Sequence, residues 1–427
     1  MKPTVTKWLL LLPLVSLLMA AISPSVQGIT LTGQRDIHDP SRIHELDGRY
    51  YTYGTGGPGG AIVTRYSDDL VQWWNGPAAI AAVPAWALQM VPENGGGMWA
   101  PDVVQVGDEY RMYYSVSSFG SQRSVIGLAT NTTLDFNSPN YQWVDQGLVI
   151  ASQPGSPYNA IDAGLLYEED TDRLWLSFGS YWNGLYSTQL NVDTGKLSPR
   201  NPAPVNIARN PGSPVNAIEA AHIMEREGSY YLVTNWDACC QGASSTYNLR
   251  VGRGDSPLGP FFDRNGVNML QGGGELFLAT EGNQIGPGHF SDFSANGLDY
   301  FAFHYYDGAA NGAPRLGIEE FGWTYDGWPV ALRDLPAGDY NRDGRVDAAD
   351  YTVWRDTFGS TTDLRADGSS GRGSAGRIDQ SDYGVWSINY SADYATATTS
   401  TTIPEPTAFS LTAIAAAYLS AFRRQES

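Results

Sequence analysis

The chain has 427 residues and a formal net charge of −19, with 48 glycines, 12% aromatic residues and only 17% charged residues. The net negative charge excludes the basic surface that a nucleic-acid partner requires. The charge alone does not indicate a ligand, because an acidic surface that keeps the protein soluble would have the same composition. Many aromatic residues and glycines are typical of short strands joined by tight turns rather than of a helical bundle, and they suit a neutral, hydroxyl-rich ligand such as a sugar.

Residues 1–28 have the pattern of a secretory signal peptide. Lys2 and Lys7 precede an apolar run that begins at Trp8, and the small and turn-forming residues "SPSVQG" follow it. We therefore expect an exported protein that is located in the cell envelope or outside the cell.

Between residues 29 and 335 one short pattern recurs five times. Each copy is a run of aromatic and β-branched residues, and several copies follow a tight turn. The copies begin at Arg49, Glu109, Arg173, Ser229 and Asp299, so the spacings are 60, 64, 56 and 70 residues. About 60 residues hold four strands with their loops, which predicts an all-β, five-bladed β-propeller over 29–335. A β-sandwich is the alternative, but it does not explain the even spacing.

Upstream of these copies lies a set of residues that carry acid–base chemistry. Asp39, Asp162, Glu219 and His289 each lie 11 or 12 residues before the second residue of their copy, and Asp102 lies 8 residues before it. Because the innermost strand of each blade begins near the propeller axis, we predict that these side chains converge on a central funnel. Aspartate also caps ordinary turns, whereas glutamate is a poor turn residue, so Glu219 is the strongest indication of a site.

From residue 338 the composition changes. The stretch "DYNRDGRVDAAD" places acidic and amide side chains at positions 1, 3, 5, 9 and 12 of a calcium-binding loop, namely Asp339, Asn341, Asp343, Asp347 and Asp350. An amphipathic helix is predicted to follow at "YTVWRDTFG". We therefore predict a small α-helical, EF-hand-like calcium module over 338–392, which either docks a partner or only stabilises the chain.

The remaining residues form a Thr-rich linker, 393–403, and a tail, 404–427. The tail has Pro-Glu-Pro, an apolar run of 15 residues (Ala408 to Phe422) and two arginines. Such a run is short for a stable membrane span of ~20 residues, so only a transient membrane contact is expected. The tail resembles the PEP-CTERM sorting signals of exported bacterial proteins; a simple C-terminal anchor is the alternative.

Several long sequence motifs between Asp36 and Pro329 resemble those of glycoside hydrolase family 43, and within that family those of the endo-α-1,5-L-arabinanases. They are "IHDPSRI", "MWAPDVV", "YNAIDAGLLY", "NAIEAAHIM", "CCQGASSTYNLRVGR" and "IGPGHFSDF". The resemblance implies a five-bladed propeller that hydrolyses arabinan, or a related plant polysaccharide, with inversion and without an organic cofactor. The module over 338–392 resembles a dockerin, which implies a docking partner.

The resemblance also implies roles for three carboxyl groups. Asp39 would be the general base, Glu219 the general acid, and Asp162 the residue that tunes the pKa of Glu219 and orients the sugar. Inverting hydrolysis needs one carboxylate to activate water and one carboxylic acid to protonate the departing oxygen. A third carboxylate close to the acid raises its pKa by repulsion between like charges.

Other residues match positions around the sugar in that family. Trp99 and Phe119 match aromatic residues of the cleft, where rings stack on the C–H patches of a furanose; packing between blades is the alternative, above all for Phe119. Asn159 and Ser180 match polar positions near the substrate. His289 matches a histidine beside an ion, often calcium, in the central channel, although a lone histidine is more often a core residue.

Some features leave alternatives open. Ala163 and Ala220 stand where the family commonly has proline, and alanine restores a backbone N–H that proline lacks. Cys239 and Cys240 are adjacent, so they bond to each other, remain thiols or pair between chains. An exo-acting arabinofuranosidase, a β-xylosidase and a non-catalytic glycan-binding propeller remain alternative functions.

Overall fold

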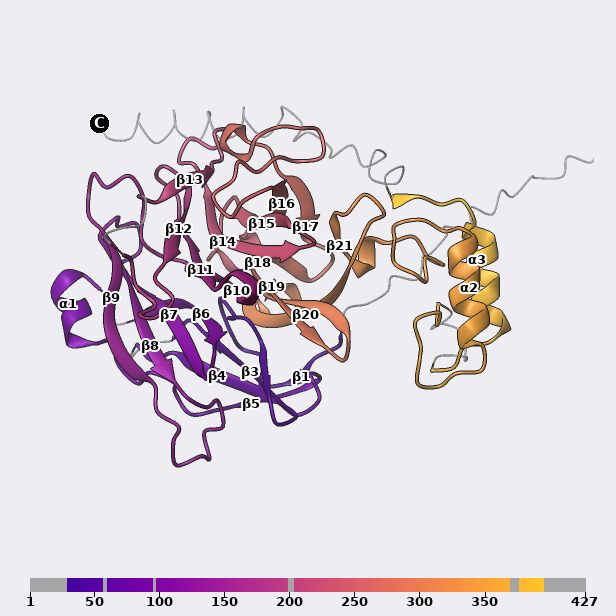
Figure 1. The fold of residues 1–427 in the computed structure, drawn as a ribbon, viewed down its shortest axis with the longest axis horizontal. Helices are drawn as coiled ribbons and strands as arrows, with labels where there is room; N and C mark the ends of the chain where they lie inside the picture. The colour runs from indigo at the N-terminus through magenta and orange to yellow at the C-terminus, as the bar shows by residue number, and fades with distance from the viewer. Residues whose placement is uncertain (1–28, 57–59, 95–96, 199–202, 369–375, 395–427) are drawn as a thin grey trace, which may run out of the picture. The chain divides into compact units, whose positions relative to one another are not determined.

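The computed structural model describes residues 29–56, 60–94, 97–198, 203–368 and 376–394 (Figure 1). The predicted signal peptide, the tail and most of the linker lie outside these ranges. Within them, no helix is both long enough and apolar enough to cross a membrane. The chain divides into two compact units at Leu335, although Arg342–Gly344 group with the first unit. We describe each unit separately.

The first unit contains five antiparallel sheets around a common centre, and the strands of each sheet follow one another in the chain (Figure 1). The predicted all-β, five-bladed propeller is thus confirmed. The first sheet contains β2 (His44–Leu46), β3 (Arg49–Gly54), β4 (Val63–Ser67) and β5 (Gln72–Asn75), and β1 (Thr32–Gly33) pairs in parallel with β5. The second contains β6 (Met98–Val106), β7 (Glu109–Val116), β8 (Ser124–Asn131) and β9 (Val144–Ser152).

The third sheet contains β10 (Gly164–Glu168), β11 (Arg173–Phe178), β12 (Leu185–Leu190) and β13 (Val205–Ala208). The fourth contains β14 (Ile218–Arg226), β15 (Ser229–Trp236), β16 (Asn248–Gly254) and β17 (Glu275–Leu278). The fifth contains β18 (Gln284–Ala295), β19 (Leu298–Asp307), β20 (Ala313–Trp323) and β21 (Pro329–Ala331). A short helix, α1 (Ala85–Met90), lies between the first two sheets in the chain. The five repeated runs of the sequence are therefore the second strands of the five blades.

The core of the propeller consists of hydrophobic clusters between neighbouring blades. One cluster joins blades one and two, and three more join each later pair in turn. The fifth closes the ring, because Trp73 and Ile43 of the first blade pack with Phe293 and Leu316 of the last. Trp73 is fully buried, and burying each such side chain contributes about 1.5–3 kcal/mol.

Each blade has a residue with positive φ near its innermost strand, before the strand in the first and third blades and inside it in the other three. These residues are Asp39, Ala100, Asp162, Ala220 and His289, with φ between 41° and 59°. In β6, β14 and β18 the register shifts at this point, which marks β-bulges that redirect the neighbouring side chains. The sequence offsets suggested that Glu219 and Asp162 are equivalent, but Glu219 lies one residue before the positive-φ position of its blade.

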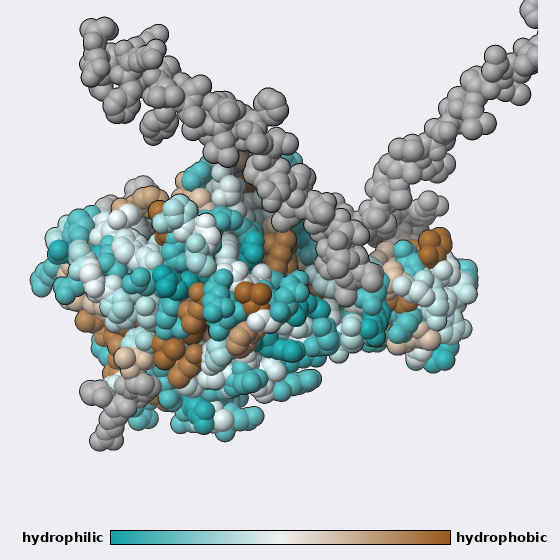
Figure 2. Space-filling view, turned by 90° about the horizontal axis from the view of Figure 1, so that it is seen from above, coloured by the Kyte–Doolittle hydropathy of each residue, from teal (hydrophilic) through white to brown (hydrophobic). Residues whose placement is uncertain are grey.

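The surface seen in Figure 2 is mostly hydrophilic, with separate hydrophobic areas instead of one continuous hydrophobic face. This distribution agrees with the acidic composition of the chain. Scattered exposed apolar residues are normal for a globular protein and do not by themselves indicate a binding surface.

The second unit contains α2 (Ala348–Thr357) and α3 (Gln380–Asn389), so the predicted helix after the acidic loop is present. The two helices are related by matching contacts. The indole N–H of Trp354 on α2 donates to the carbonyl of Asp379 at 2.9 Å, and that of Trp386 on α3 donates to the carbonyl of Asp347 at 2.7 Å. Each of these aspartates is the N-cap of its helix, so the unit is an internal duplication.

Two of the five predicted calcium ligands have a structural role in this unit. Asp347 caps α2, and Asp350 completes the capping box by accepting the backbone N–H of Asp347 at 2.7 Å. The other carboxylate oxygen of Asp350 accepts the backbone N–H groups of Tyr340 and Asn341 at 2.7 and 2.9 Å. The EF-hand-like and dockerin-like assignments remain predictions.

Candidate active site

A cleft of about 1370 Å³ on the propeller receives side chains from all five blades. Eight side chains that the sequence predicted for the propeller site line this cleft: Asp39, Trp99, Phe119, Asn159, Asp162, Ser180, Glu219 and His289. Asp102, which was also predicted to reach the central funnel, lines a separate small cavity instead, and its carboxylate accepts the backbone N–H of Leu165 at 2.9 Å. Residues far apart in the sequence therefore meet, as the propeller geometry predicted. The cleft is also lined by His38, Thr55, Tyr306 and the pair Cys239–Cys240, for which the sequence predicted no catalytic role.

Asp39 is surrounded by imidazole rings and a hydroxyl group. Its Oδ2 lies 2.8 Å from Nδ1 of His38 and accepts a hydrogen bond from Thr55, while its Oδ1 lies 3.5 and 3.4 Å from Nδ1 of His289 and His304. Burial opposes ionisation of this carboxyl group, but the interactions with His38, His289 and His304 outweigh burial and hold the pKa of Asp39 well below its ordinary value. Asp39 is thus ionised at neutral pH and able to accept a proton.

Glu219 has the opposite electrostatic environment. Its side chain is buried at the start of β14, and the Ser180 hydroxyl donates to its Oε2 at 2.6 Å. Burial is the largest effect and raises the pKa of Glu219 to about 7; the Ser180 hydrogen bond lowers it, and the negative charge of Asp39 raises it. Glu219 can therefore keep a proton under conditions in which Asp39 cannot, which is the division that acid–base catalysis requires.

Asp162 is the third carboxyl group of the cleft. Burial first, and then the charges of Glu219 and Asp39, raise its pKa well above the ordinary value, while a hydrogen bond from the backbone N–H of Ala220 lowers it. Burial and the charge of Asp39 raise the pKa of Glu219, and repulsion between Glu219 and Asp162 disfavours ionisation of both together, so the tuning role of Asp162 remains a prediction. A proline at position 220 would remove the N–H that Asp162 accepts.

The aromatic and polar residues of the cleft differ in exposure. Phe119 is 85% exposed in the loop after β7, so it does not pack within a blade, and Trp99 is half-buried. Asn159 is only 2% exposed, and its Oδ1 accepts the Ser124 hydroxyl at 2.7 Å. The two aromatic rings are thus the better placed of these residues to contact a ligand.

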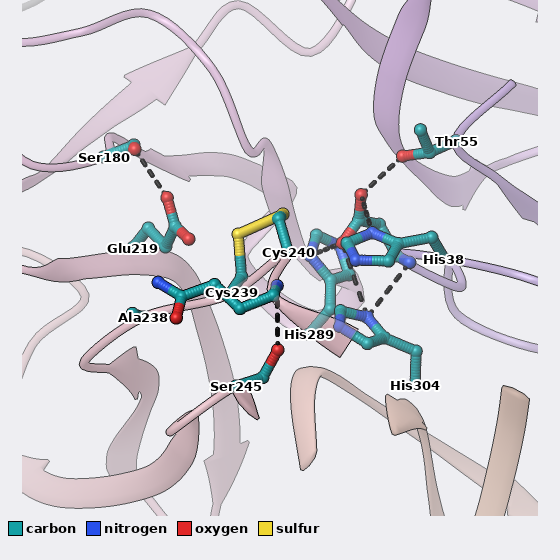
Figure 3. Close-up of a disulfide and its surroundings, with 12 residues drawn as sticks. His38, Thr55, Ser180, Glu219, Ala238, Cys239, Cys240, Ser245, His289 and His304 are labelled. Atoms are coloured by element: carbon teal, nitrogen blue, oxygen red, sulfur yellow. Dashed lines mark hydrogen bonds and ion pairs between the residues drawn. A yellow bond between two sulfur atoms is a disulfide. The ribbon is translucent and has the colours of Figure 1, made fainter. Parts of the chain in front are cut away.

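Cys239 and Cys240 form a disulfide in the turn after β15 (Figure 3). Of the states left open by the sequence, the structure therefore has the intrachain bond. Cys240 is exposed, has a φ of 64°, and donates its backbone N–H to the Tyr306 hydroxyl at 2.8 Å. Tyr306 has no local sequence motif that could have indicated this contact.

The predicted ion near His289 can be compared with the space beside it. A cavity of about 10 Å³ is lined by His289, Asp162, Asp102 and His222, among others. This volume accommodates about one water-sized particle. Calcium takes six to eight oxygen ligands, so a hydrated calcium ion beside His289 would have to extend into the large cleft, which His289 also lines. An ion beside His289 remains a prediction, and no catalytic step is derived through it.

Comparison with known proteins gives consistent similarities. The family model "Glycosyl hydrolases family 43" matches residues 32–329, which include the whole cleft-lining set predicted from the sequence. The extracellular exo-α-(1→5)-L-arabinofuranosidase ArbA of Cellvibrio japonicus is 38% identical over 305 residues, covering 69% of this chain and 86% of that protein. The extracellular endo-α-(1→5)-L-arabinanase 1 of Bacillus subtilis is 38% identical over 296 residues, covering 69% and 87%. The solved structure of Cellvibrio cellulosa α-L-arabinanase complexed with arabinohexaose matches with a TM-score of 0.64 and 36% identity, covering 69% of this chain and 95% of that one.

Proposed function

The chain belongs to family 43 of the glycosyl hydrolases, and from this premise we propose that it is an exported enzyme that hydrolyses α-1,5-linked arabinan by an inverting acid–base mechanism. The observation that carries the proposal is the pairing, in one cleft, of an ionised Asp39 with a Glu219 whose pKa is raised to about 7. Similar proteins that are named for arabinan hydrolysis, and named extracellular, support the substrate and the export.

In the proposed reaction Asp39 accepts a proton from a water molecule while the water oxygen bonds to the anomeric carbon. Glu219 donates its proton to the departing glycosidic oxygen as the bond between that oxygen and the anomeric carbon breaks. Asp39 ends protonated and Glu219 ionised, and exchange with solvent restores both groups. Asp162 would orient the sugar, and Trp99 and Phe119 would stack on its C–H patches.

We propose that the enzyme cleaves arabinan within the chain (endo action) and not only from its ends (exo action). A volume of about 1370 Å³ exceeds the 300–1,000 Å³ of ordinary small-molecule pockets, so the cleft has room for several sugar units. An exo-acting arabinofuranosidase is the second candidate, and the similarity to ArbA, which is named as an exo enzyme, favours it.

The decisive experiment measures reducing-sugar release from linear arabinan, with the products resolved by chain length. Wild type should release oligomers, and Glu219→Gln should lower turnover by at least 100-fold, as loss of general-acid catalysis typically does. Glu225→Gln, an exposed position on the same strand, is the matched control and should keep full activity. Monomers alone would favour the exo candidate. No release from wild-type enzyme would contradict the proposal and turn attention to xylan and to glycan binding without turnover.

For the remaining segments we propose what the sequence indicates. Residues 1–28 direct export, the tail after the Thr-rich linker acts as a PEP-CTERM-like sorting signal, and the C-terminal unit binds calcium through its acidic loop and docks a partner. The two capped helices are compatible with such a module.

A further inference from the structure

A continuous chain of hydrogen bonds links the disulfide turn to Asp39. The backbone N–H of Cys240 donates to the Tyr306 hydroxyl at 2.8 Å, and that hydroxyl lies 2.8 Å from Nε2 of His38. Nδ1 of the same ring lies 2.8 Å from Oδ2 of Asp39. Three blades thus contribute to one path that ends at the residue proposed as the general base.

The direction of the first hydrogen bond is fixed, because an amide N–H can only donate and the Tyr306 oxygen must accept from Cys240. The Tyr306 hydroxyl keeps its own proton, and we assign that proton to the hydrogen bond with Nε2 of His38. Burial raises the pKa of Tyr306 above its ordinary value, so this proton stays on the hydroxyl. A neutral His38 that accepts at Nε2 carries its proton at Nδ1, where it donates to Asp39.

The ring of His38 is also held from the side. It stacks on His304 with centroids 3.8 Å apart and an interplanar angle of 26°. Nδ1 of His304 accepts the backbone N–H of Asp39 at 3.1 Å, so this second ring is itself fixed to the segment that carries the base. Rotation of His38 would therefore break both the stacking and its two hydrogen bonds.

The turn that carries Cys240 is fixed by several features. The disulfide joins neighbouring residues, and the backbone N–H of Gln241 donates to the Ser245 hydroxyl at 3.0 Å. The turn packs closely on Gly312, where an added Cβ would lie 2.2 Å from the backbone nitrogen of Ala243. Figure 3 shows the disulfide and Ser245 together with Glu219 and the three imidazoles that surround Asp39. The N–H that begins the chain of hydrogen bonds is thus presented by a constrained backbone.

From this geometry we infer that Tyr306, fixed by the disulfide turn, is a positioning residue that acts through His38 to hold Asp39 in place for the attack of water. The inference rests on the proposed hydrolysis of arabinan. Tyr306 does not need to contact the sugar for this role. Its effect on the reaction is transmitted by the imidazole, so removing the hydroxyl should affect turnover more than substrate binding.

The test is a double-mutant cycle on linear arabinan. Tyr306→Phe leaves Nε2 of His38 as a buried acceptor without a partner, which should lower kcat about 10- to 100-fold with less than a twofold change in KM. In His38→Asn the amide nitrogen takes the place of Nδ1 and can donate to Asp39 without Tyr306. Adding Tyr306→Phe to this variant should therefore change kcat less than twofold.

Two controls separate this role from general damage. Tyr113→Phe removes another buried hydroxyl, whose hydrogen bond of 2.7 Å goes to the carbonyl of Gly195 outside the cleft, and it should leave kcat unchanged. The variant Cys239→Ser/Cys240→Ser keeps the N–H but frees the turn, and it should lower kcat in the same direction as Tyr306→Phe. Equal losses from Tyr306→Phe with and without His38→Asn would show that Tyr306 only anchors the turn and would overturn the inference.

A spectroscopic measurement is independent of turnover. The chain has five histidines, so ¹⁵N-histidine labelling gives a simple spectrum in which His38 is assigned by its absence in His38→Asn. Nδ1 of His38 should be protonated and Nε2 should be an unprotonated acceptor. The reverse pattern would overturn the inference whatever the substrate. A correct pattern with no hydrolysis of arabinan would contradict the proposed function alone.

Discussion

The raised pKa of Glu219 predicts how the stability of the protein depends on pH, and this effect can be measured without measuring catalysis. Burial moves this pKa from an ordinary 4.5 to about 7. Because the folded state binds the proton more tightly, the associated stability is fully present below pH 4.5 and is lost as the pH rises towards 7. The difference of 2.5 pKa units corresponds to about 3 kcal/mol.

The perturbation is Glu219→Gln, which keeps the shape and the hydrogen-bonding capacity of the side chain but cannot ionise. The variant should have nearly the wild-type free energy of unfolding at pH 4.5 and should exceed it by about 3 kcal/mol at pH 8. Repulsion between Glu219 and Asp162 is also removed, which adds to the difference in the same direction. The variant that loses turnover is thus predicted to be the more stable protein at neutral pH.

The assay is urea unfolding followed by tryptophan fluorescence, at half-unit steps from pH 4.5 to pH 8, for wild type and variant. Only the difference between the two curves is interpreted, since Asp39 and the histidines titrate in both proteins. A constant difference across this range would show that Glu219 does not change its ionisation on folding, and it would refute the argument for a buried acid.

Three further predictions follow from the cleft and the C-terminal unit. Ser180→Ala removes the hydrogen bond that lowers the pKa of Glu219, so the alkaline limb of the pH profile of kcat/KM should move up by about 1–2 units; an unchanged limb would contradict this role. Phe119→Ala removes an 85% exposed ring, so KM for arabinan should rise severalfold, as expected for a loss of about 0.5–1.5 kcal/mol of stacking, with no change in the unfolding midpoint. Calcium added to the metal-free full chain should give a binding heat by calorimetry that Asp343→Ala lowers, whereas equal heats from wild type and variant would contradict the EF-hand-like interpretation.

Most of the fold could be predicted because the second strand of every blade repeats the same aromatic pattern at a regular spacing. The first strands were harder to predict, since a positive-φ residue interrupts β6, β14 and β18 and another precedes each of β2 and β10. The bulge in β14 makes Ala220, and not Glu219, the counterpart of Asp39 and Asp162. A count of residues along the chain cannot reveal this, because a bulge changes which side chain faces the axis without changing the count.

Residues of the candidate site could be predicted where they belong to a sequence motif shared with the family. They were missed where their role depends on a contact with another blade. Ser180 was expected near the substrate, and its hydroxyl donates a hydrogen bond to the carboxyl group of Glu219. The backbones of the two residues also form an isolated β-bridge between the third and fourth blades. Tyr306 belongs to no such motif, and its contact with His38 joins positions 268 residues apart. Such pairings are set by how the blades close into a ring, which local sequence patterns do not describe.

The division of labour between the two proposed catalytic carboxyl groups follows from this ring. Asp39 and Glu219 are both largely buried, so burial alone would raise the pKa of each. They diverge because Asp39 lies among imidazoles contributed in part by the fifth blade, whereas the carboxyl group of Glu219 accepts a hydrogen bond from a neutral hydroxyl of the third. Neither environment exists within a single blade. The base and the acid are therefore defined by the neighbours that closure of the propeller supplies, and exchanging their side chains without exchanging those neighbours would not exchange their roles.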